Sequence, residues 1–99
     1  MITIFVEYKI DEMNREIFLS QQSEWKQNAI RHGGKNYSLL EGVDQPNLFV
    51  ETFEVSHLQE YQSFKADRKS WEDFTSLVAG GSEKAHVWAF SSVNSDVKG

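Results

Sequence analysis

The hydrophobic pattern along this 99-residue chain changes period in a fixed order, and that order limits the folds open to it. Hydrophobic residues alternate over 2–10 and recur at helical spacing up to Gly33-Gly34. They alternate again on both sides of the turn at 44–47, return to helical spacing from Ser56, and alternate once more over 85–93. The chain therefore reads β-α-β-β-α-β.

This order is the split pattern of ferredoxin-like domains, so we expect an α+β protein with a four-stranded antiparallel sheet. The expected elements are strands over 2–10, 36–43, 48–55 and 85–93, a helix over 12–32, and two helical pieces over 57–67 and 70–78. Ser56 and Gln59 have the spacing of a capping box for the second helical stretch. We expect one domain over residues 1–93 and a frayed tail over 94–99.

Composition argues against several classes of partner and site. The net charge is −5, and the basic residues form no long cluster, so nucleic-acid binding is disfavoured. No apolar stretch approaches the roughly 18 residues of a membrane span, so we expect no membrane partner and a cytoplasmic location. The chain has no cysteine, which excludes disulfides and thiolate metal ligands.

One face of the expected sheet is unusually aromatic. Right-handed crossovers place both helical layers on the same face and leave the other bare. Aliphatic strand residues such as Ile4, Val50 and Val87 suit helix packing, which assigns the bulky alternates to the bare face. These alternates are Phe5, Glu7, Phe49, Glu51, Phe53, His86, Trp88 and Phe90. Such a patch exceeds what soluble monomers usually expose, so we expect a homodimer through the sheet face, or else a cover from the chain's own helical or C-terminal segments.

Three polar residues on this face, Glu7, Glu51 and His86, form the candidate catalytic set. A carboxylate among aromatic rings is partly desolvated, which favours its acting as a proton acceptor. With His86, the set would also suit a metal ion, although we expect neither a metal nor a cofactor. The alternative is structural pairing of these side chains with Lys9, Arg68 or water. The expected ligand-binding residues are Phe5, Phe49, Phe53, Trp71, Trp88 and Phe90.

The layout from Met1 to about Val93 resembles the dimeric α+β barrel superfamily, which includes antibiotic biosynthesis monooxygenase-like proteins. The resemblance implies two sheets paired as a barrel and a small organic ligand inside the fold. Haem-degrading relatives carry an Asn in the first strand and a Trp and a His in the second helical region. This sequence has Glu7 and Trp71 there but no His over 70–78, which argues against haem degradation.

Two functions remain open from the sequence. One is a cofactor-independent monooxygenase or isomerase acting on a small apolar or aromatic metabolite. The other is a non-enzymatic dimer that binds a small molecule or serves a structural or regulatory role.

Overall fold

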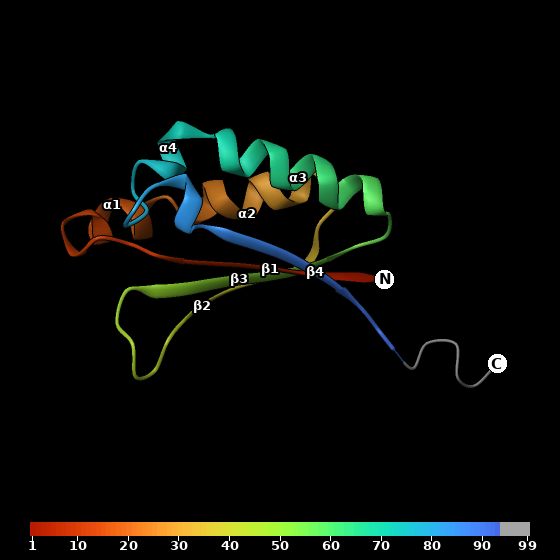
Figure 1. The fold of residues 1–99 in the computed structure, drawn as a ribbon, viewed down its shortest axis with the longest axis horizontal. Helices are drawn as coiled ribbons and strands as arrows, with labels where there is room; N and C mark the ends of the chain where they lie inside the picture. The colour runs from red at the N-terminus through yellow and green to blue at the C-terminus, as the bar shows by residue number, and fades with distance from the viewer. Residues whose placement is uncertain (94–99) are drawn as a thin grey trace.

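Four strands form one antiparallel sheet in the spatial order β2-β3-β1-β4 (Figure 1). The computed structural model describes residues 1–93; the tail expected over 94–99 lies outside the described residues. The strands are β1 (Ile2–Lys9), β2 (Lys35–Glu41), β3 (Leu48–Val55) and β4 (His86–Ser91). This is the ferredoxin-like order, and it confirms the predicted α+β class.

The helices all lie on one side of the sheet, so the opposite face is open (Figure 1). They are η1 (Glu12–Asn14), α1 (Arg15–Ser20), α2 (Gln22–Arg31), α3 (Leu58–Ser70), α4 (Glu72–Thr75) and η2 (Ser82–Lys84). The single helix expected over 12–32 is interrupted at Gln21, whose φ and ψ of −109° and 22° are not helical. The second helical region breaks at Trp71, which is extended.

The structure confirms the predicted glycine stop of the first helical stretch and corrects the predicted capping box of the second. At Gly33, φ is +87°, and a Cβ on Gly34 would lie 2.7 Å from the Ala29 carbonyl oxygen, so the Gly-Gly pair ends α2 as expected. The capping box expected from Ser56 and Gln59 is wrong. The Glu60 carboxylate instead accepts hydrogen bonds from the backbone N–H groups of Ser56 and His57, at 3.0 Å each.

Strand register determines which side chains face the helices, and it corrects the prediction for β3. Directly paired residues in an antiparallel sheet point to the same face. Ile4 pairs with Phe53, and Tyr8 pairs with Phe49, so these aromatic residues face the helices. Glu51, paired with Val6, also faces them. The prediction that Phe49, Glu51 and Phe53 lie on the bare face was therefore wrong, whereas that for Phe5, Glu7, His86, Trp88 and Phe90 was right.

An aromatic core fills the space between the sheet and the helices. Phe18 stacks on Trp25 with ring centroids 5.7 Å apart, and Phe74 meets Tyr8 edge to face at 4.8 Å. Phe53 meets Phe64 in the same way at 4.9 Å. All these rings are inaccessible to solvent or nearly so. Burial of large rings supplies much of the stability available to so short a chain.

Candidate functional site

A completely buried ion pair lies between the sheet and α3. The guanidinium of Arg68 donates to both carboxylate oxygens of Glu51, with Nη1–Oε2 and Nη2–Oε1 distances of 2.5 and 3.1 Å. Both side chains have zero exposure. Removing two charges from water is costly, and only a bidentate pair with further hydrogen bonds offsets that cost.

Two tyrosine hydroxyl groups complete the shell around the Glu51 carboxylate. Tyr8 donates to Oε2 at 2.5 Å, and Tyr37 donates to Oε1 at 2.7 Å. Burial raises the pKa of both tyrosines, and the negative charge of Glu51 raises each pKa further. Both phenols therefore remain protonated donors.

Arg68 is held on its other sides as well. Its Nε donates to Asn28 Oδ1 at 2.7 Å, and its Nη2 donates to the Trp25 carbonyl oxygen at 3.1 Å. The guanidinium carbon lies 4.7 Å from the ring centroid of Phe74 and 5.0 Å from that of Phe64. Burial lowers the pKa of Arg68, but the charge of Glu51, the hydrogen bonds to it and the two nearby tyrosines together more than offset this effect, so the pKa is raised and the ion pair persists.

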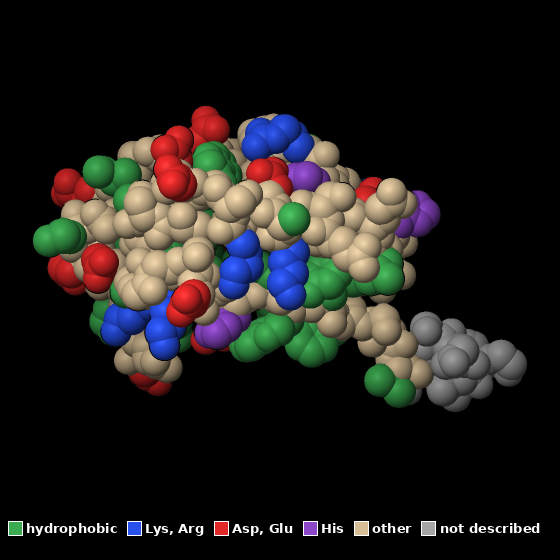
Figure 2. Space-filling model, turned by 45° about the horizontal axis from the view of Figure 1, so that its top comes forward, with side chains coloured by type: hydrophobic (Ala, Val, Ile, Leu, Met, Phe, Trp, Pro, Cys, Tyr) green, Lys and Arg blue, Asp and Glu red, His purple; other side chains and the backbone are tan. Residues whose placement is uncertain are grey.

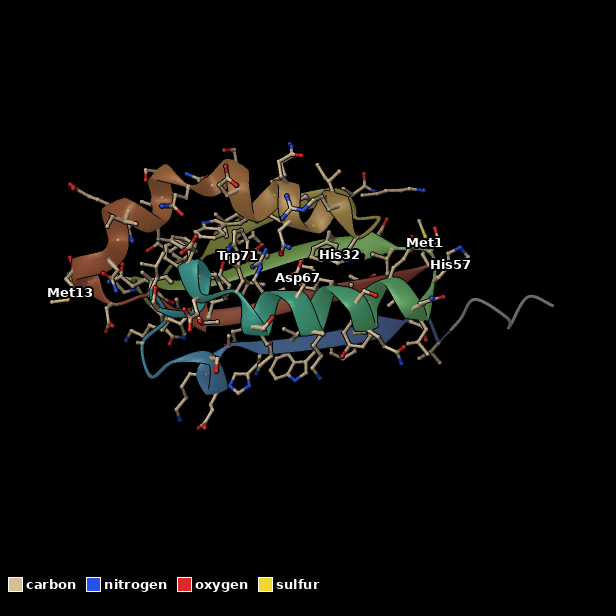
Figure 3. The ribbon with its side chains drawn as sticks, turned by 90° about the horizontal axis from the view of Figure 1, so that it is seen from above. Met1, Met13, His32, His57, Asp67 and Trp71 are labelled. Carbon is tan, nitrogen blue, oxygen red and sulfur yellow. The ribbon has the colours of Figure 1, made fainter. Side chains whose placement is uncertain are left out.

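The hydrogen bonds continue from Asn28 to the surface between α2 and α3 (Figure 3). Asn28 Nδ2 donates to Asp67 Oδ2 at 3.0 Å, and His32 Nε2 lies 2.8 Å from the same oxygen. The hydrogen bond from His32 holds the pKa of Asp67 below its usual range. The chain from Tyr8 to His32 is thus continuous.

This buried network is suited to holding the fold together and not to acid–base chemistry. Every buried side-chain nitrogen and oxygen atom within residues 1–93 has a hydrogen-bond partner. Glu51 has no exposed surface through which a substrate would reach it. Of the two roles expected for Glu51, the geometry corresponds to structural pairing with Arg68.

The open face of the sheet carries the other candidate site. Glu7 pairs with His86 across β1 and β4 and with Val50 across β3, so these three side chains form one row. The next row places Phe5 beside Trp88. The imidazole of His86 stacks on the indole of Trp88, with centroids 5.6 Å apart and planes 13° from parallel. Phe5 meets Phe90 edge to face at 5.5 Å.

These side chains surround an apolar groove of about 450 Å³. Its lining residues are Phe5, Glu7, Val50, Trp88 and Phe90. Trp88 and Phe90 are 46% and 54% exposed, which is high for large hydrophobic residues. Figure 2 shows hydrophobic side chains gathered along the lower margin of the molecule, below the helix layer, with a histidine beside them. We call this surface the aromatic groove.

The remaining predicted site residues lie apart from the aromatic groove. Trp71 follows α3 on the helix side, where its ring meets Trp25 edge to face at 5.2 Å (Figure 3). Glu51 faces away from Glu7 and His86, so the three do not assemble as one set. Within residues 1–93, no group of three or more histidine and acidic side chains is placed to hold a metal ion.

Sequence reasoning named Arg68 as an alternative structural partner of Glu51 but missed the other residues of the network. Tyr8, Asn28 and Tyr37 were not singled out as site residues. A signal was present in α3, because Tyr61, Phe64 and Arg68 follow at helical spacing and place Arg68 on the inward edge. The two helical pieces expected over 57–67 and 70–78 left Arg68 between them, outside both.

Solved structures similar to this chain share its fold at low sequence identity. A candidate antibiotic biosynthesis monooxygenase from Nitrosomonas europaea is 18% identical, with 94% of this chain and 99% of that chain covered and a TM-score of 0.70. One from Bordetella bronchiseptica is 14% identical, with coverages of 93% and 96% and a TM-score of 0.73. SnoaB from Streptomyces nogalater, a cofactor-independent oxygenase, is 15% identical, with coverages of 92% and 91% and a TM-score of 0.69. The resemblance to antibiotic biosynthesis monooxygenase-like proteins is confirmed for the fold.

Sequence comparison gives the family. No curated protein sequence matches the chain. A family model described as a transmembrane secretion effector matches residues 1–95. Among the helices of residues 1–93, none is both long enough and apolar enough to cross a membrane. The chain belongs to the transmembrane secretion effector family, and it has the ferredoxin-like fold of antibiotic biosynthesis monooxygenase-like proteins.

Proposed function

We propose that this chain is a homodimeric, cofactor-independent oxygenase that acts on a small aromatic or apolar metabolite held on the open sheet face. The observation that carries the proposal is the position of Glu7. Its carboxylate lines the aromatic groove and lies in register with His86. A proton acceptor beside an apolar surface is the arrangement that proton abstraction from an aromatic substrate requires.

The chemistry proposed for this site begins with that proton transfer. Glu7 takes a proton from the bound substrate, and the stacked imidazole of His86 lies at the next position to receive or return it. The aromatic rings of Phe5 and Trp88 hold the substrate by stacking. The substrate carbanion then adds dioxygen and takes back a proton to form a hydroperoxide, whose O–O bond breaks with loss of water to leave a carbonyl group, so the substrate itself supplies the electrons.

A second copy of the chain completes the site in this proposal. The aromatic groove is open to water on one side, and the exposed rings of Trp88 and Phe90 provide apolar area for a partner. Two open faces packed about a two-fold axis would exclude water from Glu7 and enclose the ligand between the sheets. The fold shared with SnoaB, a cofactor-independent oxygenase, supports the same assignment.

Dioxygen uptake tests the proposal. Hydroxylated two-ring and three-ring aromatic compounds are incubated with the protein while oxygen concentration and substrate absorbance are recorded. We expect uptake that is lost in Glu7→Gln and retained in Glu24→Gln, a control that removes an exposed acid on α2. Substrate conversion without oxygen uptake would indicate an isomerase instead, and no conversion of any compound would contradict an enzymatic role.

A non-enzymatic binding module is the second candidate, and the packing of the interior favours it. The space between sheet and helices is filled by aromatic rings and by the Glu51–Arg68 pair, which leaves the open face as the place for a ligand. Such a module would bind aromatic compounds in the same assay without converting them, and Glu7→Gln would leave their affinity nearly unchanged.

A further inference from the structure

A polarity gradient runs along the open face and indicates the chemical class of its ligand. The aromatic side chains Phe5, Trp88 and Phe90 make one part of the groove apolar, and the row after Phe5 and Trp88 contains Glu7 and His86. Beyond that row lies a second groove of about 320 Å³, which Glu7, Lys9, Lys84 and His86 help to line. Glu7 lines both grooves, so the two are adjacent.

The cationic end is a local exception in an acidic chain. The protein carries 15 acidic and 10 basic residues, yet two lysines and a histidine line the second groove around one carboxylate. Lys9 and Lys84 are both exposed, and Glu83 precedes Lys84 in the same turn. Figure 2 shows the same order along the lower margin, with basic side chains, then a histidine, then hydrophobic side chains.

We propose that the open face binds an aromatic carboxylate, with its rings in the aromatic groove and its carboxylate at Lys9 and Lys84. The inference rests on the proposed function only in placing the ligand on the same face. Successive rows on one face of a sheet are about 7 Å apart, so two fused rings at Trp88 bring a carboxylate to the row of His86. The flexible side chain of Lys9 reaches that position from the next row, and that of Lys84 reaches it from η2.

Paired probes of the same shape test the inference. Binding of 2-naphthoate and of the uncharged 2-naphthamide is measured by isothermal titration calorimetry at low salt. We expect the naphthoate to bind about fivefold more tightly, the scale of weak exposed ion pairs with two lysines. The preference should shrink as salt is added, because exposed charges are screened.

The double variant Lys9→Met/Lys84→Met should abolish the preference and keep the affinity for 2-naphthamide. Lys26→Met/Lys65→Met, which removes two exposed lysines from α2 and α3, should keep the preference. Equal binding of the two probes to the wild type, or an unchanged preference in the Lys9/Lys84 variant, would overturn the inference. So would no binding of either probe to a protein that is dimeric in sedimentation, because the second copy alone would then cover the face.

The oxygenase proposal and the inference about the ligand class can each fail without the other. If 2-naphthoate binds with the expected preference but no aromatic compound supports dioxygen uptake, the ligand class stands and the reaction does not. If uncharged hydroxylated aromatics support uptake as well as acids do, the reaction stands and the ligand class does not.

Discussion

The carboxylate of Glu51 and the guanidinium of Arg68 lie 2.5 Å apart at their closest atoms, and neither side chain has any exposure to solvent. Glu51 comes from the middle of the sheet and Arg68 from the last turn of α3, so the pair joins the two layers of the fold. Both charges depend on each other, because each one alone would be a buried, unpaired ion.

Arg68→Met should destabilise the protein strongly. The substitution keeps an unbranched apolar stem but leaves the Glu51 carboxylate buried without its cation, which costs about 3–5 kcal/mol. A domain of this size has about 5–15 kcal/mol in total, so the variant should be close to unfolding. Urea denaturation followed by tryptophan fluorescence measures the change.

Two further variants separate the ion pair from general effects of the substitution. The double variant Glu51→Gln/Arg68→Met removes both charges and should be more stable than Arg68→Met alone. Arg31→Met removes an exposed arginine from the end of α2 and should cost little. Equal costs for Arg68→Met and Arg31→Met would show that the buried pair contributes nothing to stability.

Tyr8 should make the protein sensitive to alkaline pH. Its folded pKa is raised above the ordinary value of 10.0, first by burial and then by the charge of Glu51. The stability that the neutral Tyr8 hydroxyl contributes is therefore fully present below pH 10. It is lost as the pH rises from there towards the pKa of Tyr8 in the folded protein. Tyr8→Phe lacks this group, so its stability should fall less steeply above pH 10.

Urea midpoints of wild type and Tyr8→Phe between pH 8 and pH 11 test this expectation. At pH 8 the variant should be less stable by about 1.5–3 kcal/mol, the scale of a hydrogen bond to a charged group. A stability difference that does not change with pH would contradict the role of Tyr8 as a buried neutral donor.

The order of elements followed from the sequence because periodicity is a local property of a chain. The alternation over 2–10 and the glycines after α2 were interpreted correctly without any knowledge of distant residues. The break at Gln21 was not predicted, and the break expected between 67 and 70 lies at Trp71, because packing of the short helices onto the sheet decides where they end.

The sequence did not show which residues of β3 face the helices, because this strand has hydrophobic residues on both faces. Leu48 and Val50 alternate with Phe49 and Phe53, and residue size does not decide between the sets. Pairing with β1 decides, and pairing is a non-local property. The same reason explains why Glu51 was placed beside Glu7: its partner Arg68 is distant in sequence and approaches only from the helix layer.

Glu41 should make the protein sensitive to acid. It accepts two hydrogen bonds from Arg15, at 2.6 and 2.9 Å, and one from the Asn47 backbone N–H at 2.8 Å. The hydrogen bonds from Arg15 chiefly lower the pKa of Glu41, from 4.5 to about 2. A lowered pKa gives stability that is present above pH 4.5 and lost as the pH falls towards 2.

Glu41→Gln should therefore be less stable than wild type at neutral pH, and the difference should shrink between pH 4.5 and pH 2. Thermal unfolding across that range measures the difference. Glu24→Gln serves as the control for loss of one exposed negative charge. A gap between wild type and Glu41→Gln that stays constant down to pH 2 would show that Arg15 does not stabilise the ionised form.

Trp88 should be central to self-association if the open face is the dimer interface. In sedimentation equilibrium at micromolar concentration, the wild type should have about twice the chain mass of 11.4 kDa. Trp88→Lys places an unpaired charge in an apolar interface, so this variant should sediment as a monomer. Leu58→Lys is the matched control, because Leu58 is also an exposed hydrophobic residue, at 57%, but lies on α3 at the helix side. A monomeric wild type, or dissociation caused equally by both substitutions, would rule out the sheet face as the interface.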